Sequence, residues 1–439
     1  MTFEVDFHPT RVLEIELTKP IPMIEFNLDG RQYRDAYAVL TINQRPVATC
    51  FLSPLAAQRH LSPAQVASAI WQTAHDDINY AITQQQRSPL TELLPNGLSA
   101  SVMPAPLRLE QGPHITVNIC TKDRTNWLKQ CLPGLFAQTY TNFDVVIIDN
   151  APSTPDTANY IRDHYGSETR LRYVHEPVAG LSVARNRGLA ESQGEIVAMT
   201  DDDVRVPSNW LESIARTFTQ HPYTACVTGP LFPAELETPA QLWVEQFAGG
   251  FNRGLTPRLF DMKANRPRRP FFYPYLPGIV GTGANMAFRS EVIRELGGFS
   301  PYLGLGTPCR GGEDLDMFFR VITSGRQIAY TPEVYLYHYH RREYEGLLRQ
   351  IEGYGTASSA RLTKWFLEKP SRIPGFLLKL PYIPYVLLFS PSDDLKRRQQ
   401  YQHSYPTELR QVEQRGMLAG PLAYLKSRLT PIPDPPSGG

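Results

Sequence analysis

Three adjacent carboxylates are the part of this sequence best suited to chemistry. Asp201, Asp202 and Asp203 directly follow an apolar, strand-like run at residues 195–200. Grouping carboxylates costs electrostatic repulsion, which a bound cation relieves. Oxygen ligands of this kind suit Mg²⁺ or Mn²⁺. A solvated acidic turn before the helix that Pro207 introduces has the same composition, so the cluster alone leaves both interpretations open.

A second acidic group stands at a predicted helix start. The segment GGEDLDMFFR, residues 311–320, places Glu313, Asp314 and Asp316 behind two glycines. Acids at this position stabilise a helix by capping it and by interacting with its dipole. The functional alternative is a positioned carboxylate that removes a proton as a general base.

Three further segments carry residues that could touch a substrate. GTGANMAFR, residues 281–289, contains Gly283 and Asn285, and its small residues allow close approach of a ligand to the backbone. Arg185 lies near the start of a predicted helix and could face a phosphate. His338 follows a strand-like run and could supply an imidazole ligand. The ordinary explanations are a tight turn, an exposed helix charge and a structural histidine.

The alternation of strands and helices predicts how these residues are positioned. From His114 onward, apolar runs at 115–120, 143–149, 171–175 and 195–200 alternate with helix-length segments at about 126–138, 156–165 and 181–192. Runs that are apolar on both faces predict an α/β fold with a mostly parallel sheet flanked by helices. Such sheets bind ligands at the carboxyl ends of their strands, where this chain has Thr121 to Arg124, Asp149-Asn150 and the three aspartates.

The composition is that of a globular protein and argues against several classes of function. The chain has 439 residues, which at about 100–200 residues per domain allows several domains. Lys and Arg number 44 against 43 Asp and Glu, so we expect no nucleic-acid partner. Five cysteines without CxxC spacing predict neither a disulfide framework nor a zinc site, and indicate a reducing cytosol. The first ten residues lack the basic and apolar regions of a signal peptide, so we expect none.

The N-terminal region has a different residue pattern from the segment in which predicted strands and helices alternate. Residues 1–87 predict a small module of short β-strands followed by one amphipathic helix over 63–86. Asp29-Gly30 lies between the strand-like runs 11–17 and 36–42 and predicts a hairpin there. Residues 88–113, rich in Pro, Leu and Ser, predict a linker.

The C-terminal region predicts a helical and basic extension over 341–430. Residues 338–430 carry 15 Lys and Arg against 8 Asp and Glu. Within them, residues 373–390 are strongly apolar but are interrupted by three prolines and a lysine. A spanning helix needs about 20 predominantly apolar residues, so we predict an interfacial or docked segment. Residues 431–439 are expected to be disordered.

Taken together and in this order, these segments resemble the family 2 glycosyltransferases, which have the GT-A fold with its Rossmann-like sheet. The resemblance covers roughly residues 115–340 through the segments ITVNICTKDR, FDVVIIDNAPSTPDT, AGLSVARNRGLA, IVAMTDDDV, GTGANMAFR, LGGFSPYLGLG, GGEDLDMFFRVITSG and HYHR. It implies a catalytic domain at 114–340 that transfers a sugar, with inversion, from a nucleotide-diphosphate donor to an acceptor hydroxyl. One departure is that Cys120 and Asp123 stand where the family often has proline and asparagine.

The resemblance also implies roles for individual residues. Asp314 would be the catalytic base, and Glu313 would support acceptor binding. Asp203 would ligate a divalent metal, Mn²⁺ or Mg²⁺, with Asp201 on the ribose or the metal's water and His338 completing the metal site. The donor would be bound by a larger set of residues: Thr121, Asp123, Arg124, Asp149, Arg185, Asp201, Asp202, Gly283 and Asn285.

The implied acceptor is a glycan or a lipid-linked glycan. The basic extension and residues 373–390 predict peripheral contact with an anionic membrane surface, and hence a cytoplasmic protein at the inner face of the cell membrane. Packing of the apolar stretch on the catalytic domain is an equal alternative.

Two other functions remain open from the sequence. A sugar nucleotidyltransferase has a glycine-rich phosphate loop after its first strand, whereas TKDRTNW contains no glycine. A non-catalytic carbohydrate-binding or membrane-binding scaffold would not need the intact aspartate and Glu-Asp motifs.

Overall fold

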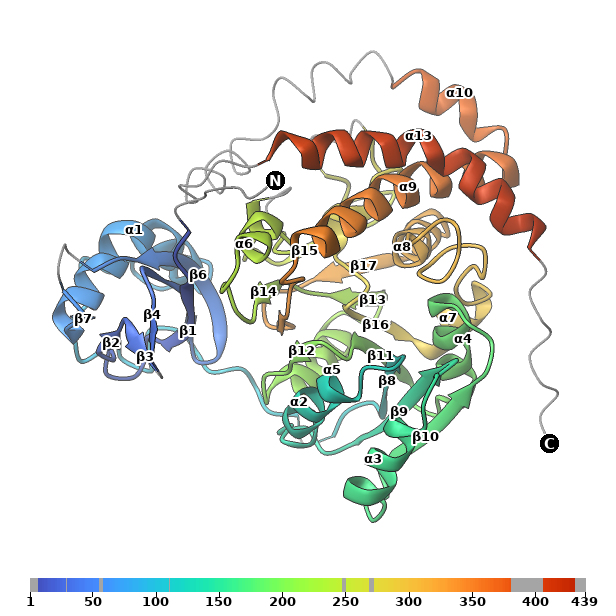
Figure 1. Cartoon of the computed structure of the whole chain (residues 1–439). Helices are drawn as coiled ribbons and strands as arrows, with labels where there is room; N and C mark the ends of the chain where they lie inside the picture. The colour runs from blue at the N-terminus through green and yellow to red at the C-terminus, as the bar shows by residue number, and fades with distance from the viewer. Residues whose placement is uncertain are drawn as a thin grey trace.

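A three-stranded sheet and one long helix form the N-terminal part of the chain (Figure 1). The computed structural model describes residues 7–28, 30–54, 58–109, 111–246, 250–267, 272–379 and 406–430. The N-terminal sheet has the order β1-β5-β6, with strands β1 (Thr10–Glu16), β5 (Asp35–Ile42) and β6 (Arg45–Leu52). Helix α1 (Pro63–Thr83) begins with a capping box at Ser62 and Gln65 and buries Val66, Ile70 and Ile78 against this sheet.

This N-terminal part has a hydrophobic core of its own. Leu93 and Met103, from the predicted linker, belong to that core, so this stretch packs on the module. The separate core supports our proposal that residues 1–87 form a domain.

The structure confirms a hairpin around Gly30 but corrects the strands that this hairpin joins. β1 and β5 pair in parallel, and parallel strands cannot be joined by a two-residue turn. Gly30 instead lies between two short antiparallel strands, β3 (Asn27–Leu28) and β4 (Arg31–Gln32); Asp29 lies outside the described residues. A second short ribbon joins β2 (Ile24–Glu25) to β7 (His60–Leu61).

An eight-stranded sheet forms the centre of the larger domain (Figure 1). Its order is β10-β9-β8-β11-β16-β13-β17-β15. The strands are β8 (Ile115–Thr121), β9 (Phe143–Asn150), β10 (Leu171–Glu176), β11 (Ile196–Asp201), β13 (Thr224–Thr228), β15 (Arg258–Phe260), β16 (Asn285–Arg289) and β17 (Gln327–Tyr330). β8, β9, β10 and β11 run parallel, and β16 is antiparallel to both of its neighbours. The α/β prediction of a mostly parallel sheet flanked by helices is confirmed.

Side chains alternate across this sheet and bury helices on both faces. One core packs Ile196 and Ala198 of β11 against three helices, α2 (Thr125–Phe136), α3 (Asp156–Tyr165) and α5 (Trp210–Gln220). The other packs Val197 and Met199 against α4 (Leu181–Glu191), α7 (Ser290–Glu295) and α8 (Glu313–Thr323). Burial on both faces explains why the central strands are predominantly apolar on both faces.

A small sheet of order β12-β18-β14 lies beside the end of β11. It consists of β12 (Val204–Arg205), β14 (Leu231–Pro233) and β18 (Leu336–His338). Val204 is paired with His338, which places this histidine beside the three aspartates. Helix α6 (Pro239–Gln246) and the 3₁₀ turn η2 (Pro277–Val280) complete this region.

The N-terminal module packs on this small sheet. Tyr37 and Val39 of β5 share a core with Tyr335 and Tyr337, and Tyr337 donates a hydrogen bond to Glu14. At the rim of this contact, Glu237 forms ion pairs with Arg31 from the module and with Arg342 from the larger domain.

In the described part of the C-terminal region, helices α9 (Tyr344–Glu368), α10 (Arg372–Leu377) and α13 (Thr407–Leu429) follow the larger domain. α13 crosses α9 at glycines: a Cβ on Gly416 would lie 2.2 Å from the Glu352 carbonyl oxygen, and one on Gly420 would lie 2.0 Å from Ser359 Oγ (Figure 1). The predicted segment 373–390 is described only to residue 379, and the predicted disordered tail lies outside the described residues. In the described part of the chain, no helix is both long and apolar enough to cross a bilayer.

Candidate active site

A cavity of about 930 Å³ lies over the carboxyl ends of three parallel strands. Thr121 of β8, Asn150 of β9 and Asp201 of β11 line one side of it. The start of α8, with Gly312 at a φ of 89°, and one face of α9 line the other side. The strand-end convergence predicted from the sequence is therefore present in one cavity.

Two aspartates and one histidine form a cluster in this cavity. Asp201, Asp203 and His338 each offer a ligand atom, and these atoms lie within 4.8 Å of one another. His338 Nε2 is 3.3 Å from Asp203 Oδ1. Burial disfavours a charged imidazole, but Asp203 and Asp201 outweigh burial and raise the pKa of His338. Two carboxylates and one imidazole are a donor set that a divalent transition metal accepts.

Arg124 forms ion pairs with two residues of the aspartate loop, which comprises Asp201, Asp202 and Asp203. Its guanidinium lies 2.8 Å from Asp202 Oδ1 and 2.6 Å from Asp203 Oδ2. Burial alone would raise the pKa of Asp203, but His338 and Arg124 hold it well below its ordinary value. Burial raises the pKa of Asp202 to about 7, and its second oxygen accepts a hydrogen bond from Thr121. Asp202 therefore faces protein groups, whereas Asp203 stays ionised in the cluster.

Arg185 joins the aspartate loop to the start of α8. This buried guanidinium lies 2.8 Å from Glu313 Oε1 and 3.6 Å from Asp201 Oδ1. Burial raises the pKa of Glu313 to about 7 although Arg185 opposes the shift. Among the described residues, Glu313 Oε2 has no hydrogen-bond partner. One oxygen of Glu313 is thus fixed by Arg185, and the other is buried without a hydrogen-bond partner among the described residues.

Asp314 lies beside Gly283 and lines the cavity. Its Oδ1 accepts a hydrogen bond of 2.7 Å from the Leu315 amide, which fixes the carboxylate at the helix start. A Cβ on Gly283 would lie 3.0 Å from Asp314 Oδ2 and 3.0 Å from Arg185 Nη2. The absence of a side chain at residue 283 therefore leaves space for both groups.

Three predicted donor-binding residues are placed differently from the prediction. Asn285 is fully buried, and its amide accepts from Trp210 Nε1 and donates to the Pro230 and Val334 carbonyls, so it joins three segments of the fold. Asp149 is buried against the Tyr173 hydroxyl, at 2.9 Å, and burial raises its pKa. Neither residue lines the cavity.

Asp123 is the third of these residues. Its Oδ1 accepts a hydrogen bond of 2.7 Å from the Ser153 amide, in the loop after β9. It is exposed and does not line the cavity. Its backbone has a φ of 53°, a conformation in which aspartate and asparagine are enriched, so its place in this turn accounts for its residue type.

Sequence reasoning missed the contribution of α9 to the cavity. Residues 346–358 of this helix, including Arg349, Gln350 and Tyr354, line it, and Arg341 lies just before the helix. The signal that could have found them is the small or polar character of residues 346, 349, 350, 353 and 357, which share one helix face.

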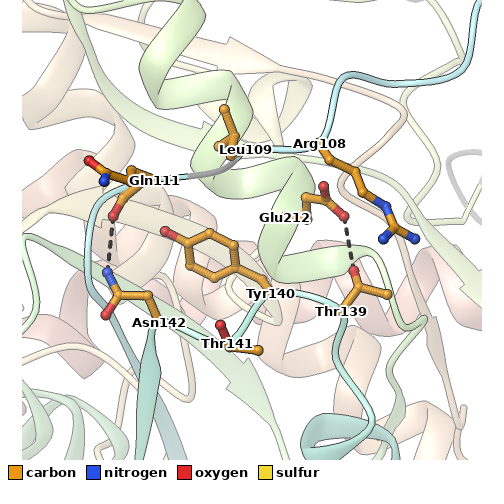
Figure 2. A pocket seen from close by; sticks show the side chains of 9 residues that line it. Arg108, Leu109, Gln111, Thr139, Tyr140, Thr141, Asn142 and Glu212 are labelled. Atoms are coloured by element: carbon orange, nitrogen blue, oxygen red, sulfur yellow. Dashed lines mark hydrogen bonds between the residues drawn. The ribbon is translucent and has the colours of Figure 1, made fainter.

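A second cavity, of about 560 Å³, is shown in Figure 2. It surrounds Tyr140, whose hydroxyl donates to the Pro113 carbonyl, and it is bordered by Thr139 and Glu212, which share a hydrogen bond. None of the predicted catalytic, donor-binding or metal-binding residues lines it. We therefore place the candidate active site in the larger cavity.

Several named proteins, two of them glycosyltransferases by name, are similar to parts of this chain. A glucosyl-dolichyl phosphate glucuronosyltransferase of Haloferax volcanii is 23% identical over 193 residues, which is 43% of this chain and 57% of that protein. A pre-mycofactocin glycosyltransferase of Mycobacterium tuberculosis is 25% identical over 248 residues, 56% of this chain and 47% of that protein. The succinoglycan biosynthesis protein ExoM of Rhizobium meliloti is 28% identical over 232 residues, 51% of this chain and 66% of that protein. The matches thus cover less than two thirds of each of these relatives.

Solved structures that are similar to this chain include a mannosyltransferase from Pyrobaculum calidifontis in complex with GDP-Man and Mn²⁺. It has a TM-score of 0.46 and 17% identity, and the match covers 84% of this chain and 98% of that one. Residues 1–349 of TarS from S. aureus, in complex with UDP-GlcNAc, give a TM-score of 0.39 and 15% identity, covering 72% of this chain and 91% of that one.

The family comparison falls on the segment that builds the cavity. The model described as glycosyl transferase family 2 matches residues 116–297, from β8 through α7 and the glycines that follow it. This range contains the aspartate loop, Arg185 and Gly283, and the sheet observed over it is the mostly parallel one expected for a GT-A domain. The match over residues 116–297 and the similarity to named glycosyltransferases together support a family 2 glycosyltransferase.

Proposed function

We propose that this protein is a metal-assisted, inverting glycosyltransferase that moves a sugar from a nucleoside-diphosphate donor to an acceptor hydroxyl. The observation that carries the proposal is one cavity that holds both the cluster of Asp201, Asp203 and His338 and the carboxylate of Asp314. A single displacement needs a base and a stabilised leaving group at one sugar ring, and these two groups are of the right kinds.

The donor side of the cavity is the aspartate loop and the strand ends. Asp203, Asp201 and His338 are the residues that would hold the metal, and the imidazole nitrogen favours Mn²⁺ over Mg²⁺, which prefers oxygen ligands. When bound, the ion stabilises the negative charge that develops on the departing diphosphate. Thr121 and Arg124 line the same side, where they keep the aspartate loop in place.

The acceptor side is the start of α8. In our proposal Asp314 accepts the proton of the attacking hydroxyl as the new glycosidic bond forms. Glu313 supports acceptor binding at the cavity wall, and Arg185 fixes Glu313 relative to Asp201. Holding two substrates in line can lower the barrier by several kcal/mol, about 7–11 in favourable model reactions.

We further propose a lipid-linked glycan as the acceptor. One relative is named a glucosyl-dolichyl phosphate glucuronosyltransferase, and this name describes a lipid-phosphate-linked sugar. Ile373, Leu377 and Leu378, in the described part of the apolar segment, are 37%, 52% and 76% exposed. A cytoplasmic position at the inner face of the cell membrane, with contact through residues 373–390 and the basic extension, would bring the cavity to such an acceptor.

The metal site is tested by Asp203→Ala in a thermal-unfolding screen of UDP-, GDP-, dTDP- and CMP-sugars with and without Mn²⁺. The wild-type protein should gain about 2.7 kcal/mol of stability at a donor concentration 100 times Kd, and only with metal. Asp203→Ala should lose this metal-dependent gain. Asp163→Ala, at an exposed helix position far from the cavity in sequence, is the matched control and should keep it. An unchanged metal-dependent gain in Asp203→Ala would rule out our metal assignment.

Gly283→Ala tests the close approach at residue 283. The added Cβ meets Asp314 and Arg185 at 3.0 Å, so both groups must shift by a few tenths of an ångström. We expect kcat to fall about 10-fold or more, because misplacement of a catalytic group by about 1 Å costs up to about 10²-fold. Gly278→Ala, where a Cβ meets nothing within 4 Å, is the control and should retain activity. Equal kcat values for the two variants would contradict the placement of Asp314.

A further inference from the structure

The outer face of α13 carries four exposed leucines. Leu418, Leu422, Leu425 and Leu429 are 85%, 57%, 47% and 83% exposed. The opposite face of the same helix, with Leu409, Gly416, Gly420 and Tyr424, is buried, mainly against α9. Single exposed leucines are common on protein surfaces, but a row of four on one helix face indicates a surface that contacts another molecule.

Basic side chains flank this row on both sides. At about 100° per residue, the four leucines fall within roughly 60° of one another, and Arg415 and Lys426 lie about 50–70° to one side. Arg410 and Arg428 lie about 90° to the other side, and all four cations are exposed. After Glu413, the helix contains no acidic residue. An apolar row between two cationic rows is the pattern of a helix that lies in the plane of a bilayer surface.

We propose that this α13 face, defined by Leu418, Leu422, Leu425 and Leu429 with their four flanking cations, docks on an anionic lipid bilayer. The leucines enter the interface between headgroups and acyl chains, and the arginine and lysine side chains reach up to the lipid phosphates. α10, which also packs on α9, exposes Leu377 and Leu378 and adds apolar surface to the same C-terminal region.

A second copy of the chain fits this face less well than a bilayer. In a two-fold dimer, the same patch meets itself, so the cationic rows of the two copies would lie close together. Like charges in such a contact are repulsive, whereas an anionic bilayer neutralises each of them. Charge complementarity therefore favours the lipid surface.

Docking through α13 would bring the bilayer surface close to the cavity, because α13 packs on α9. α9 lines the cavity with Gln350 and Tyr354 and contacts α13 at Gly355 and Glu352. Since a helix with its side chains is about 10 Å across, the docked surface would lie within roughly two helix diameters of the cavity wall. The docking does not depend on the transfer reaction, so it can be tested without donor or acceptor.

The test is sedimentation of the full-length protein with vesicles of phosphatidylglycerol and phosphatidylcholine, or of phosphatidylcholine alone. Wild-type protein should bind the anionic vesicles at least tenfold more tightly than the neutral ones. Leu418→Gln with Leu429→Gln should reduce binding to anionic vesicles at least tenfold. The matched control, Leu107→Gln with Tyr223→Gln, removes two residues that are 74% and 88% exposed elsewhere and should bind as wild type does.

A second pair of variants separates the charge from the apolar contribution. Arg415→Gln with Lys426→Gln should lose most of the preference for anionic vesicles, and added salt should have a similar effect on the wild type. Light scattering of each variant without vesicles reports the oligomeric state. The proposal is overturned if the wild-type protein does not bind anionic vesicles, or if the leucine variant binds them as tightly as the wild type does. It is also overturned if the wild-type protein is a dimer and the leucine variant is a monomer.

Discussion

Asp314→Asn is expected to lower kcat for sugar transfer by about 10²–10⁴-fold, the usual contribution of a positioned general base, while donor affinity stays nearly unchanged. The amide has almost the same shape as the carboxylate, and its oxygen can still accept the Leu315 amide hydrogen bond. It cannot take up the proton of the attacking hydroxyl. The measurement is the transfer rate at saturating donor and acceptor, together with donor binding in the presence of Mn²⁺.

Asp156→Asn is the matched control for this prediction. Asp156 is also an acid in the first turn of a helix, but it is exposed on α3 and does not line the cavity. It should keep wild-type activity. A loss of donor affinity in Asp314→Asn would assign Asp314 to binding, and an unchanged kcat would remove it from the reaction.

Asp316→Ala is expected to destabilise the folded protein by about 3–5 kcal/mol, the typical cost of removing one partner from a buried ion pair. Asp316 is fully buried in α8, and Lys364 Nζ and Trp365 Nε1 of α9 lie 2.8 Å and 2.7 Å from its Oδ1. Arg320 lies 2.9 Å from its second oxygen. Without the carboxylate, the Lys364 ammonium stays buried with only Glu368 as an ion-pair partner among the described residues. Thermal and denaturant unfolding measure the loss.

The control for Asp316→Ala is Asp163→Ala, which breaks an exposed pair with Arg162 and should cost less than about 1 kcal/mol. Burial alone would raise the pKa of Asp316, but Arg320 and Lys364 lower it. The stabilisation is therefore present above the unfolded-state pKa, near 4, and is lost as the pH falls through the lower folded-state value. Equal losses for the two variants at neutral pH would show that this buried pair does not tie α8 to α9.

The sheet and its helices were predictable because each central strand is apolar on both faces. The predicted helix 156–165 and the observed α3 share both ends, and the other predicted elements of this region differ by one or two residues at their ends. The N-terminal strands were found, but their pairing was not. A parallel pair such as β1 and β5 depends on contacts between segments that are distant in sequence, and no local turn signal reports it.

The candidate site was predictable where several groups follow strand ends or a glycine-rich helix start. Asp201, Asp203 and His338 meet as expected, although residues 203 and 338 are far apart in the chain. Asn285 shows the limit of such reasoning. Its partners are two backbone carbonyls and a tryptophan from other segments, and only the fold shows that these groups surround it. The face of α9 was missed because its residues form no family motif.

Two successive residues of β18 contact different parts of the molecule, the N-terminal module and the cluster of Asp201, Asp203 and His338. Tyr337 packs against the module and donates to Glu14, whereas the next residue, His338, faces Asp203, because successive side chains of a strand point to opposite faces. If Asp201, Asp203 and His338 hold an ion as proposed, a ligand that binds the module and displaces β18 would change the affinity of the cluster for that ion. By reciprocity, binding of the ion would change the affinity of the module for that ligand by the same factor.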